Sequence, residues 1–325
     1  MSFGHIKKVE LHTHLDCSLS YELVKKNLPE MNRELFKEKF TGYGCKNLND
    51  YLKCVDRSLD IMQNEEQLNF AVMDFFDQLK RDNVIYVEIR FAPLLHLKEG
   101  LDPIQVIEIV LNKCKIESQK SNIKFGLILC TLRHFSEHQS LETVKLIKEL
   151  DDDMIVGFDI AADEAGYSLE NHITAFEFAK SNSINCTAHA GEARGYESVI
   201  ETLNMLAPQR IGHGVRSCES TSLMKRLIKE KIHLEICLTS NLVTGVYKNI
   251  DEHPVNYFYN KKFSISINSD GRTISNTSLN EEYKKLSQTF DWKEQHFLNC
   301  NLNAIRSSFA DEKTKSDIIL QLKCQ

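Results

Sequence analysis

Two kinds of hydrophobic pattern alternate along this chain. Short apolar runs rich in isoleucine, leucine and valine are separated by longer segments whose apolar residues recur at helical spacing. The short runs predict strands at residues 8–15, 84–91, 125–132, 155–161, 185–190, 210–214, 233–238 and 263–268. The longer segments predict helices, for example at residues 140–150, 171–181, 197–206 and 221–231. Strands that alternate with helical crossovers predict a parallel sheet, and their number favours a closed (β/α)8 barrel of the TIM type.

Two segments are longer than a simple β/α unit requires. Residues 20–80, between the first and second predicted strands, have largely helical patterns, and residues 48–62 predict a helix over the mouth of the barrel. Residues 279–325 predict further helices at the C-terminal end. An open, doubly wound sheet is the alternative, but the first strand lacks the glycine-rich turn of that fold. Because no low-complexity linker interrupts the pattern, we expect one domain over residues 1–325.

Composition and charge narrow the classes of partner. The 325 residues are 42% hydrophobic, which is enough for a large buried core. Lysine and arginine number 40 against 46 acidic residues, so the formal net charge is -6. Nucleic-acid binding usually needs a basic face, and the basic residues form only isolated pairs. We therefore expect a small-molecule substrate and no nucleic-acid partner.

The cysteines and the lengths of the apolar runs predict the compartment in which the protein works. The 10 cysteines are scattered without a Cys-x-x-Cys pair, and several lie inside apolar runs. Such spacing favours reduced, buried thiols over disulfides or a cysteine-bound zinc. The N-terminus lacks an apolar signal segment, and no apolar run has membrane-spanning length. We expect a cytoplasmic protein without a membrane partner; its oligomeric state is open between monomer and weak dimer.

Candidate metal ligands stand at the C-terminal ends of predicted strands. His12 and His14 end the first strand two residues apart, so both side chains point to the same face. His189 ends the fifth strand, and Asp270 follows the eighth, which a closed barrel places beside the first. Three imidazoles and one carboxylate suit zinc in an open catalytic site, because water completes the coordination. Each residue taken alone has an ordinary structural explanation, whereas four at one end of a barrel predict a metal centre.

Two further side chains stand beside these candidates. Glu192 follows His189 on the next turn, after Gly191, which allows close approach of the backbone to a ligand. His213 lies between two glycines at the end of the sixth strand, whereas a core histidine more often has apolar neighbours. Both positions favour a functional role over a structural one.

In their order along the chain, these motifs resemble those of the adenosine deaminases of the amidohydrolase superfamily. The resemblance extends from Val9 to about Phe309, and its segments are ELHTHLD (10–16), YVEIR (86–90), LRH (132–134), DIAADE (159–164), HAGE (189–192), GHG (212–214) and SD (269–270). It implies one zinc ion per chain, bound by His12, His14, His189 and Asp270. It also implies that Glu192 shuttles protons and that His213 and Asp270 hold and activate the attacking water.

The resemblance extends to the substrate side, with departures. It implies that Asp16 meets the ribose 5′-hydroxyl, which disfavours a 5′-phosphate through like-charge repulsion. His14 also faces the substrate, and an apolar wall over the base is expected from Leu48, Tyr51, Leu52 and Val55. Ala162 replaces a glycine whose N–H meets purine N3, and we expect the contact to survive if φ stays negative.

A second departure is Gly271, where many members have an aspartate that touches N7 of the base. We expect the zinc chemistry to be unaffected and Gly271→Asp to tighten adenosine binding.

Three functions remain open from the sequence. The first is deamination of adenosine and 2′-deoxyadenosine in purine salvage. The second is the same chemistry on free adenine or on a modified adenine nucleoside. The third is a non-catalytic binding or signalling barrel, which would have no physical need for both Glu192 and His213.

Overall fold

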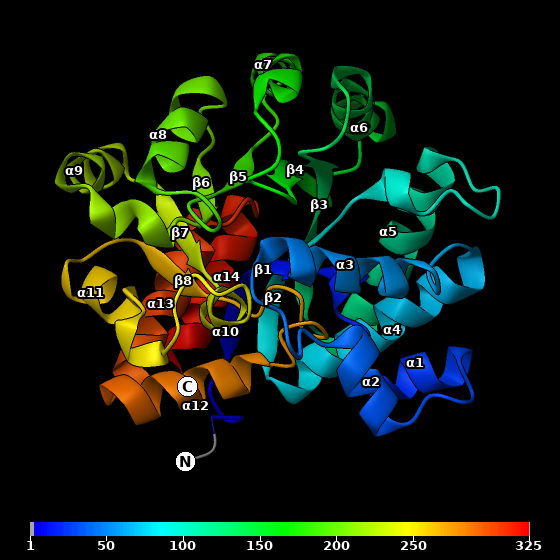
Figure 1. Cartoon of the computed structure of the whole chain (residues 1–325), viewed down its shortest axis with the longest axis horizontal. Helices are drawn as coiled ribbons and strands as arrows, with labels where there is room; N and C mark the ends of the chain where they lie inside the picture. The colour runs from blue at the N-terminus through cyan, green and yellow to red at the C-terminus, as the bar shows by residue number, and fades with distance from the viewer. Residues whose placement is uncertain (1–2, 325) are drawn as a thin grey trace.

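The centre of the molecule is a ring of parallel strands surrounded by helices (Figure 1). This computed structural model describes residues 3–324; Met1, Ser2 and Gln325, which include both limits of the predicted domain, lie outside the described residues. Within that range the strands are β1 (Lys8–His14), β2 (Val84–Phe91), β3 (Lys124–Leu132), β4 (Ile155–Ala161), β5 (Thr187–Ala190), β6 (Arg210–His213), β7 (His233–Ile236) and β8 (Ile265–Ile267). Their order is β1-β2-β3-β4 in one sheet and β5-β6-β7-β8 in the other.

Single parallel bridges join the two sheets at both edges. Thr13 pairs with Asp270 at one seam, and Phe158 pairs with Cys186 at the other. The ring is therefore closed, and the predicted barrel is confirmed. Some strands are shorter than predicted: β1 ends at His14 because a 3-10 turn (Leu15–Cys17) follows, and β7 ends at Ile236 because a helix begins at Leu238.

Helices surround the ring (Figure 1). They also form the long connection between β1 and β2 and the C-terminal segment that follows β8. The helices between β1 and β2 are α1 (Tyr21–Asn27), α2 (Arg33–Phe40), α3 (Leu48–Leu59) and α4 (Glu65–Arg81). Those of the later crossovers are α5 (Pro103–Ser121), α6 (Glu137–Leu150), α7 (Ile173–Ser181), α8 (Tyr196–Met205), α9 (Thr221–Glu230), α10 (Leu238–Val243) and α11 (Val255–Asn260). The chain ends with α12 (Leu279–Phe290), α13 (Glu294–Ser307) and α14 (Glu312–Lys323). None of these helices within residues 3–324 is both long enough and apolar enough to cross a membrane.

Helix α3 is the predicted helix over the barrel mouth. Its first turn is capped by the side chain of Asn47, which accepts the backbone N–H of Asp50 at 2.9 Å. It packs against the turn Leu15–Cys17 at the end of β1, and it ends at Leu59 rather than at the predicted residue 62.

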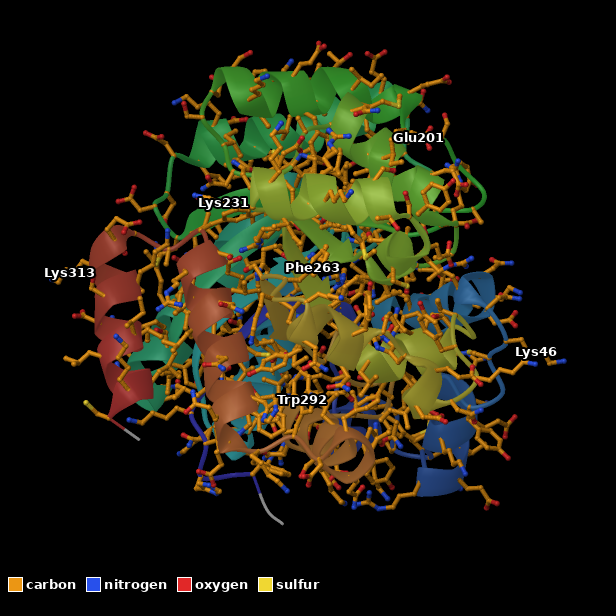
Figure 2. The ribbon with its side chains drawn as sticks, turned by 90° about the vertical axis from the view of Figure 1, so that its left-hand side faces the viewer. Lys46, Glu201, Lys231, Phe263, Trp292 and Lys313 are labelled. Carbon is orange, nitrogen blue, oxygen red and sulfur yellow. The ribbon has the colours of Figure 1, made fainter. Side chains whose placement is uncertain are left out.

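Alternation along the strands separates an apolar layer from a charged one. Val87, Ile89 and Phe91 of β2 belong to the apolar core beneath the helices, whereas Glu88 and Arg90 of the same strand are fully buried among other charged groups. On the outside of the helical ring, long polar side chains point into solvent (Figure 2). The barrel interior therefore carries a network of buried charges just below the strand ends.

Candidate metal centre and active site

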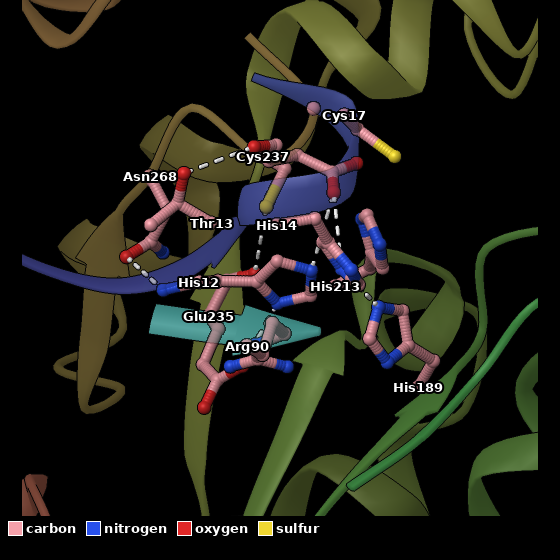
Figure 3. A network of polar contacts seen from close by, with 12 residues as sticks. His12, Thr13, His14, Cys17, Arg90, His189, His213, Glu235, Cys237 and Asn268 are labelled. Atoms are coloured by element: carbon pink, nitrogen blue, oxygen red, sulfur yellow. Dashed lines mark hydrogen bonds and ion pairs between the residues drawn. The ribbon is translucent and has the colours of Figure 1, made fainter. Parts of the chain in front are cut away.

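The four predicted metal ligands converge at the carboxyl ends of the strands, and three of them, His12, His14 and His189, are labelled in Figure 3. The Nε2 atoms of His14 and His189 are 3.3 Å apart. The Nε2 atoms of His12 and His14 each lie 3.5 Å from Oδ1 of Asp270. Asp270 reaches the cluster across the seam between β8 and β1, where its backbone N–H donates to the carbonyl oxygen of His12 at 3.0 Å.

Buried carboxylates hold two of these histidines from behind. Nδ1 of His12 is 2.8 Å from Glu235, and Nδ1 of His189 is 3.2 Å from Asp159. Burial opposes ionisation of Glu235, but the charges of Arg90 and Arg210 and the hydrogen-bonded histidine together outweigh it and hold the pKa of this carboxyl well below its usual value. Because a carboxylate only accepts, each Nδ1 carries a hydrogen and each Nε2 lone pair faces the cluster.

One guanidinium group, that of Arg90, connects the two carboxylates; Figure 3 shows it beside Glu235. Arg90 lies 2.8 Å from Glu235 and 3.0 Å from Asp159, and all three side chains are fully buried. The orientation of His12 and that of His189 are therefore fixed by one continuous network.

The hydrogen bonds around His213 place its ring hydrogen on Nε2, whereas His12 and His189 carry theirs on Nδ1. The backbone N–H of Val255 donates to Nδ1 of His253 at 3.2 Å, so the hydrogen of this ring lies on Nε2 and donates to Oδ1 of Asn241, also at 3.2 Å. Asn241 then donates through Nδ2 to Nδ1 of His213 at 3.1 Å. Burial lowers the pKa of both histidines, to about 3 for His253, so both are neutral. His213 therefore has its hydrogen on Nε2, 3.5 Å from Glu192.

The donor atoms of the cluster fit a zinc ion. Within residues 3–324, ligand atoms of His12, His14 and His189 all lie within 4.8 Å of one another. Nε2 of His12 is buried without a hydrogen-bond partner among the described residues, which is rare for a buried polar atom. Burial opposes ionisation of Asp270, but the neighbouring His12, His14 and His213 together outweigh it and hold the pKa of this carboxyl well below its usual value. Imidazole nitrogens and a charged carboxylate are ligands that zinc prefers.

Glu192 lies beside the cluster on a turn that a second glutamate fixes. The carboxylate of Glu164 accepts the backbone N–H of Gly191 at 2.6 Å, of Glu192 at 2.9 Å and of Arg194 at 3.0 Å. Burial, followed by the charges of Asp270 and Glu164, raises the pKa of the Glu192 carboxyl well above its usual value. This environment favours the protonated form, which can donate a hydrogen to a ligand.

A cavity of about 320 Å³ opens over the cluster. Its lining contains the predicted residues His14, Asp16, Leu48, Tyr51, Leu52, Val55, Ala162, His189, Glu192, His213 and Asp270. His12 is fully buried beneath it. Asp16 accepts the backbone N–H of Ala92 at 3.2 Å, and burial raises the pKa of the Asp16 carboxyl to about 6.

The comparisons with known proteins agree with this geometry. The adenosine deaminase family model matches residues 7–324 of the chain. Proteins named adenosine deaminase from Clostridium acetobutylicum and Clostridium kluyveri are 33% and 34% identical to it, over 98% and 95% of this chain and 97% and 91% of theirs. The chain belongs to the adenosine deaminase family.

Solved structures of other deaminases share the fold. An adenine deaminase from Arthrobacter aurescens has a TM-score of 0.89 at 22% identity and covers 97% of this chain and 98% of its own. An Arabidopsis N6-mAMP deaminase has a TM-score of 0.88 at 23% identity and covers 99% of both chains. A zinc-bound amidohydrolase from Burkhoderia ambifaria has a TM-score of 0.86 at 18% identity and covers 99% of this chain and 94% of its own. At these identities the likeness concerns the fold alone.

The backbone angle φ of Ala162 does not meet the condition under which we expected its N–H to contact the purine. We expected the N–H contact to survive if φ stayed negative, but φ is 76°. The chain turns sharply here, between the end of β4 and Glu164, whose side chain is committed to the Gly191–Arg194 turn. A left-handed conformation costs a residue with a Cβ roughly 1–2 kcal/mol, which explains why a glycine suits this position.

The surroundings of Gly271 bear on the expectation that Gly271→Asp tightens adenosine binding, which stays a prediction. A Cβ at Gly271 would overlap the Tyr51 hydroxyl and lie 2.8 Å from the Cβ of Cys17. Gly271 lies behind these two side chains and is not among the residues that line the cavity. A larger residue there requires Tyr51 and Cys17 to shift before it can contact the base.

The sequence analysis assigned no role to the residues that hold the functional side chains of the adenosine deaminase site in place. These are Arg90, Asp159, Glu164, Glu235, Asn241 and His253. A signal was present for Arg90, Asp159 and Glu235, because they are charged residues within apolar strands, and the two carboxylates among them lie behind the histidines. Charged residues at such positions are buried and paired, and here each carboxylate pairs with a histidine of the cluster.

Proposed function

We propose that this chain catalyses hydrolytic deamination of adenosine and 2′-deoxyadenosine to inosine and 2′-deoxyinosine, with release of ammonia. One zinc ion is bound by His12, His14, His189 and Asp270. The observation that carries the proposal is that three groups with different hydrogen-bonding roles meet at one cavity. Nε2 lone pairs face the metal position, His213 offers an Nε2–H donor, and Glu192 favours a protonated carboxyl.

The chain's own residues divide the reaction between them. When bound, zinc supplies a Lewis acid that lowers the pKa of water toward neutrality. His213 holds the oxygen of the attacking water through its Nε2–H, and the Asp270 carboxylate accepts a proton from that water. Glu192 donates its proton to N1 of the purine, which makes C6 electrophilic. The proton taken from water by Asp270 then passes to the amino group, the C6–N bond breaks and ammonia leaves, and Glu192 recovers its proton from the new hydroxyl group on C6.

The charge of the cavity favours a nucleoside over a nucleotide. Asp16, Asp56 and Asp163 are among the lining residues, whereas Lys53 is the one lysine or arginine in the lining and is paired with Asp50 at 3.3 Å. A 5′-phosphate needs cationic partners and would instead meet carboxylates. The same lining leaves Asp16 available to a ribose hydroxyl, which free adenine lacks.

The proposal is tested by ammonia release from a panel of 6-aminopurines with the zinc-loaded protein. We expect turnover of adenosine and 2′-deoxyadenosine, with kcat/KM at least about tenfold lower for adenine, which lacks one good hydrogen bond. AMP and N6-methyl-AMP should be poorer still. Preference for adenine or for a nucleotide would favour the alternative substrates, and inertness toward every aminopurine would favour a non-catalytic barrel.

A further inference from the structure

The hydroxyl of Tyr51 occupies the space that a side chain at position 271 would need. Tyr51 comes from α3 and is 5% exposed. Its hydroxyl lies 3.5 Å from the carbonyl oxygen of Gly271 and 3.3 Å from Oγ of Ser275. A Cβ built on Gly271 would overlap this hydroxyl. The glycine therefore leaves room for a tyrosine that reaches it from 220 residues away.

Tyr51 is the polar member of an otherwise apolar wall. Leu48, Leu52 and Val55 line the cavity from the same helix and offer no hydrogen-bonding group. The Ser275 hydroxyl can donate to the tyrosine oxygen, which leaves the tyrosine hydrogen free for a second partner. The other acceptor in reach, the Gly271 carbonyl, lies at the limit of hydrogen-bonding distance.

The chemistry of a bound purine indicates what this hydrogen would meet. With N1 at Glu192 and C6 at the metal cluster, the five-membered ring lies on the side of C6 away from N1. Position 271 directly follows the cluster residue Asp270, so Tyr51 approaches the cavity next to the cluster. The acceptor on that edge of the base is N7.

We propose that the Tyr51 hydroxyl donates a hydrogen bond to N7 of the purine and that Gly271 is required to leave space for it. Tyr51 is thus a specificity-determining residue. This inference rests on the proposed function, because it takes the orientation of the base from Glu192 and the metal cluster.

The test measures binding of two non-reacting ligands, inosine and 7-deazainosine, to the zinc-loaded protein by calorimetry. The second ligand has C–H in place of N7. We expect the wild type to bind inosine about 5- to 10-fold more tightly, the effect of one hydrogen bond. Tyr51→Phe should lose this preference by weakening inosine alone. Tyr167→Phe, which changes another tyrosine of the same lining, should keep it.

A second arm tests the role of Gly271. Gly271→Ala should weaken inosine binding more in the wild type, where the methyl group meets both the Tyr51 hydroxyl and the Cβ of Cys17, than in Tyr51→Phe, where only the contact with Cys17 remains. Equal weakening of both ligands by Tyr51→Phe, or no change in the preference, would overturn the inference. So would equal harm from Gly271→Ala in both backgrounds. A wild type that binds neither ligand would contradict the proposed function instead.

Discussion

The side chains around the metal cluster come from strand ends and are held by buried charges, whereas the apolar wall of the cavity comes from α3 and is held by packing. His12 and His189 are each fixed by a carboxylate, and Arg90 locks both carboxylates. Tyr51 is positioned by van der Waals contact and long hydrogen bonds. The reacting groups are therefore held by the barrel itself. Recognition of the base depends on α3, whose sequence can change with little effect on the metal cluster.

The largest loss is expected from the cluster side, with Glu192→Gln. The amide keeps the shape but has no acidic proton for the purine ring, so kcat should fall by roughly 10²–10⁴-fold. Ammonia release gives the rate, and metal analysis should show zinc content equal to wild type. Activity within about threefold of wild type would remove Glu192 from the proposed chemistry.

Asn241→Asp tests the hydrogen-bond state of His213. An aspartate accepts from both histidines, so the hydrogen of His213 moves from Nε2 to Nδ1 and the donor that faces Glu192 is lost. Loss of one positioned donor should lower kcat by about 10²-fold. Nitrogen NMR of labelled histidine reports the tautomer; a His213 that is already protonated on Nδ1 in the wild type contradicts the assignment.

Arg90→Met tests the network behind the histidines. Removing the guanidinium leaves Glu235 and Asp159 with fewer buried partners, so we expect a loss of about 3–5 kcal/mol in the free energy of unfolding. Zinc affinity should fall by about 10- to 100-fold, because the groups that orient His12 and His189 loosen.

Denaturant titration and competition with a chelator measure the two effects of Arg90→Met. The control is Arg226→Met, which removes a partly exposed ion pair with Glu230 and should cost at most about 1 kcal/mol. Equal effects of the two variants would contradict a special role for Arg90.

The smallest effect is expected from Ala162→Gly on the recognition side. Glycine relieves the cost of the left-handed φ, while its greater freedom in the unfolded chain offsets part of that gain. The free energy of unfolding should rise by less than about 1 kcal/mol, with KM for adenosine within about twofold. A destabilised variant would show that the methyl group has a packing role.

Much of the cluster could be predicted from the sequence because its residues mark strand ends. His12 and His14 follow from strand alternation, and His189 and Asp270 follow from the barrel count. The pairing of Arg90 with Glu235 could not be predicted, because it depends on which inward side chains reach one another across the barrel.

The recognition side was predicted less well. The apolar wall follows from the periodicity of α3, but the contact between Tyr51 and Gly271 depends on how that helix packs over the barrel. The φ of Ala162 depends on the turn that follows β4, and the local sequence gave no warning of it because alanine usually avoids this conformation.

The central claim is that the cluster of His12, His14, His189 and Asp270 binds the zinc ion on which adenosine deamination depends. The direct measurement is a titration of zinc into metal-stripped protein, with bound zinc and the rate of ammonia release from adenosine followed together. Activity should be absent without metal and should rise in proportion to bound zinc until one ion per chain is reached. Full activity in the stripped protein, or one tightly bound zinc with no deamination, would contradict the account.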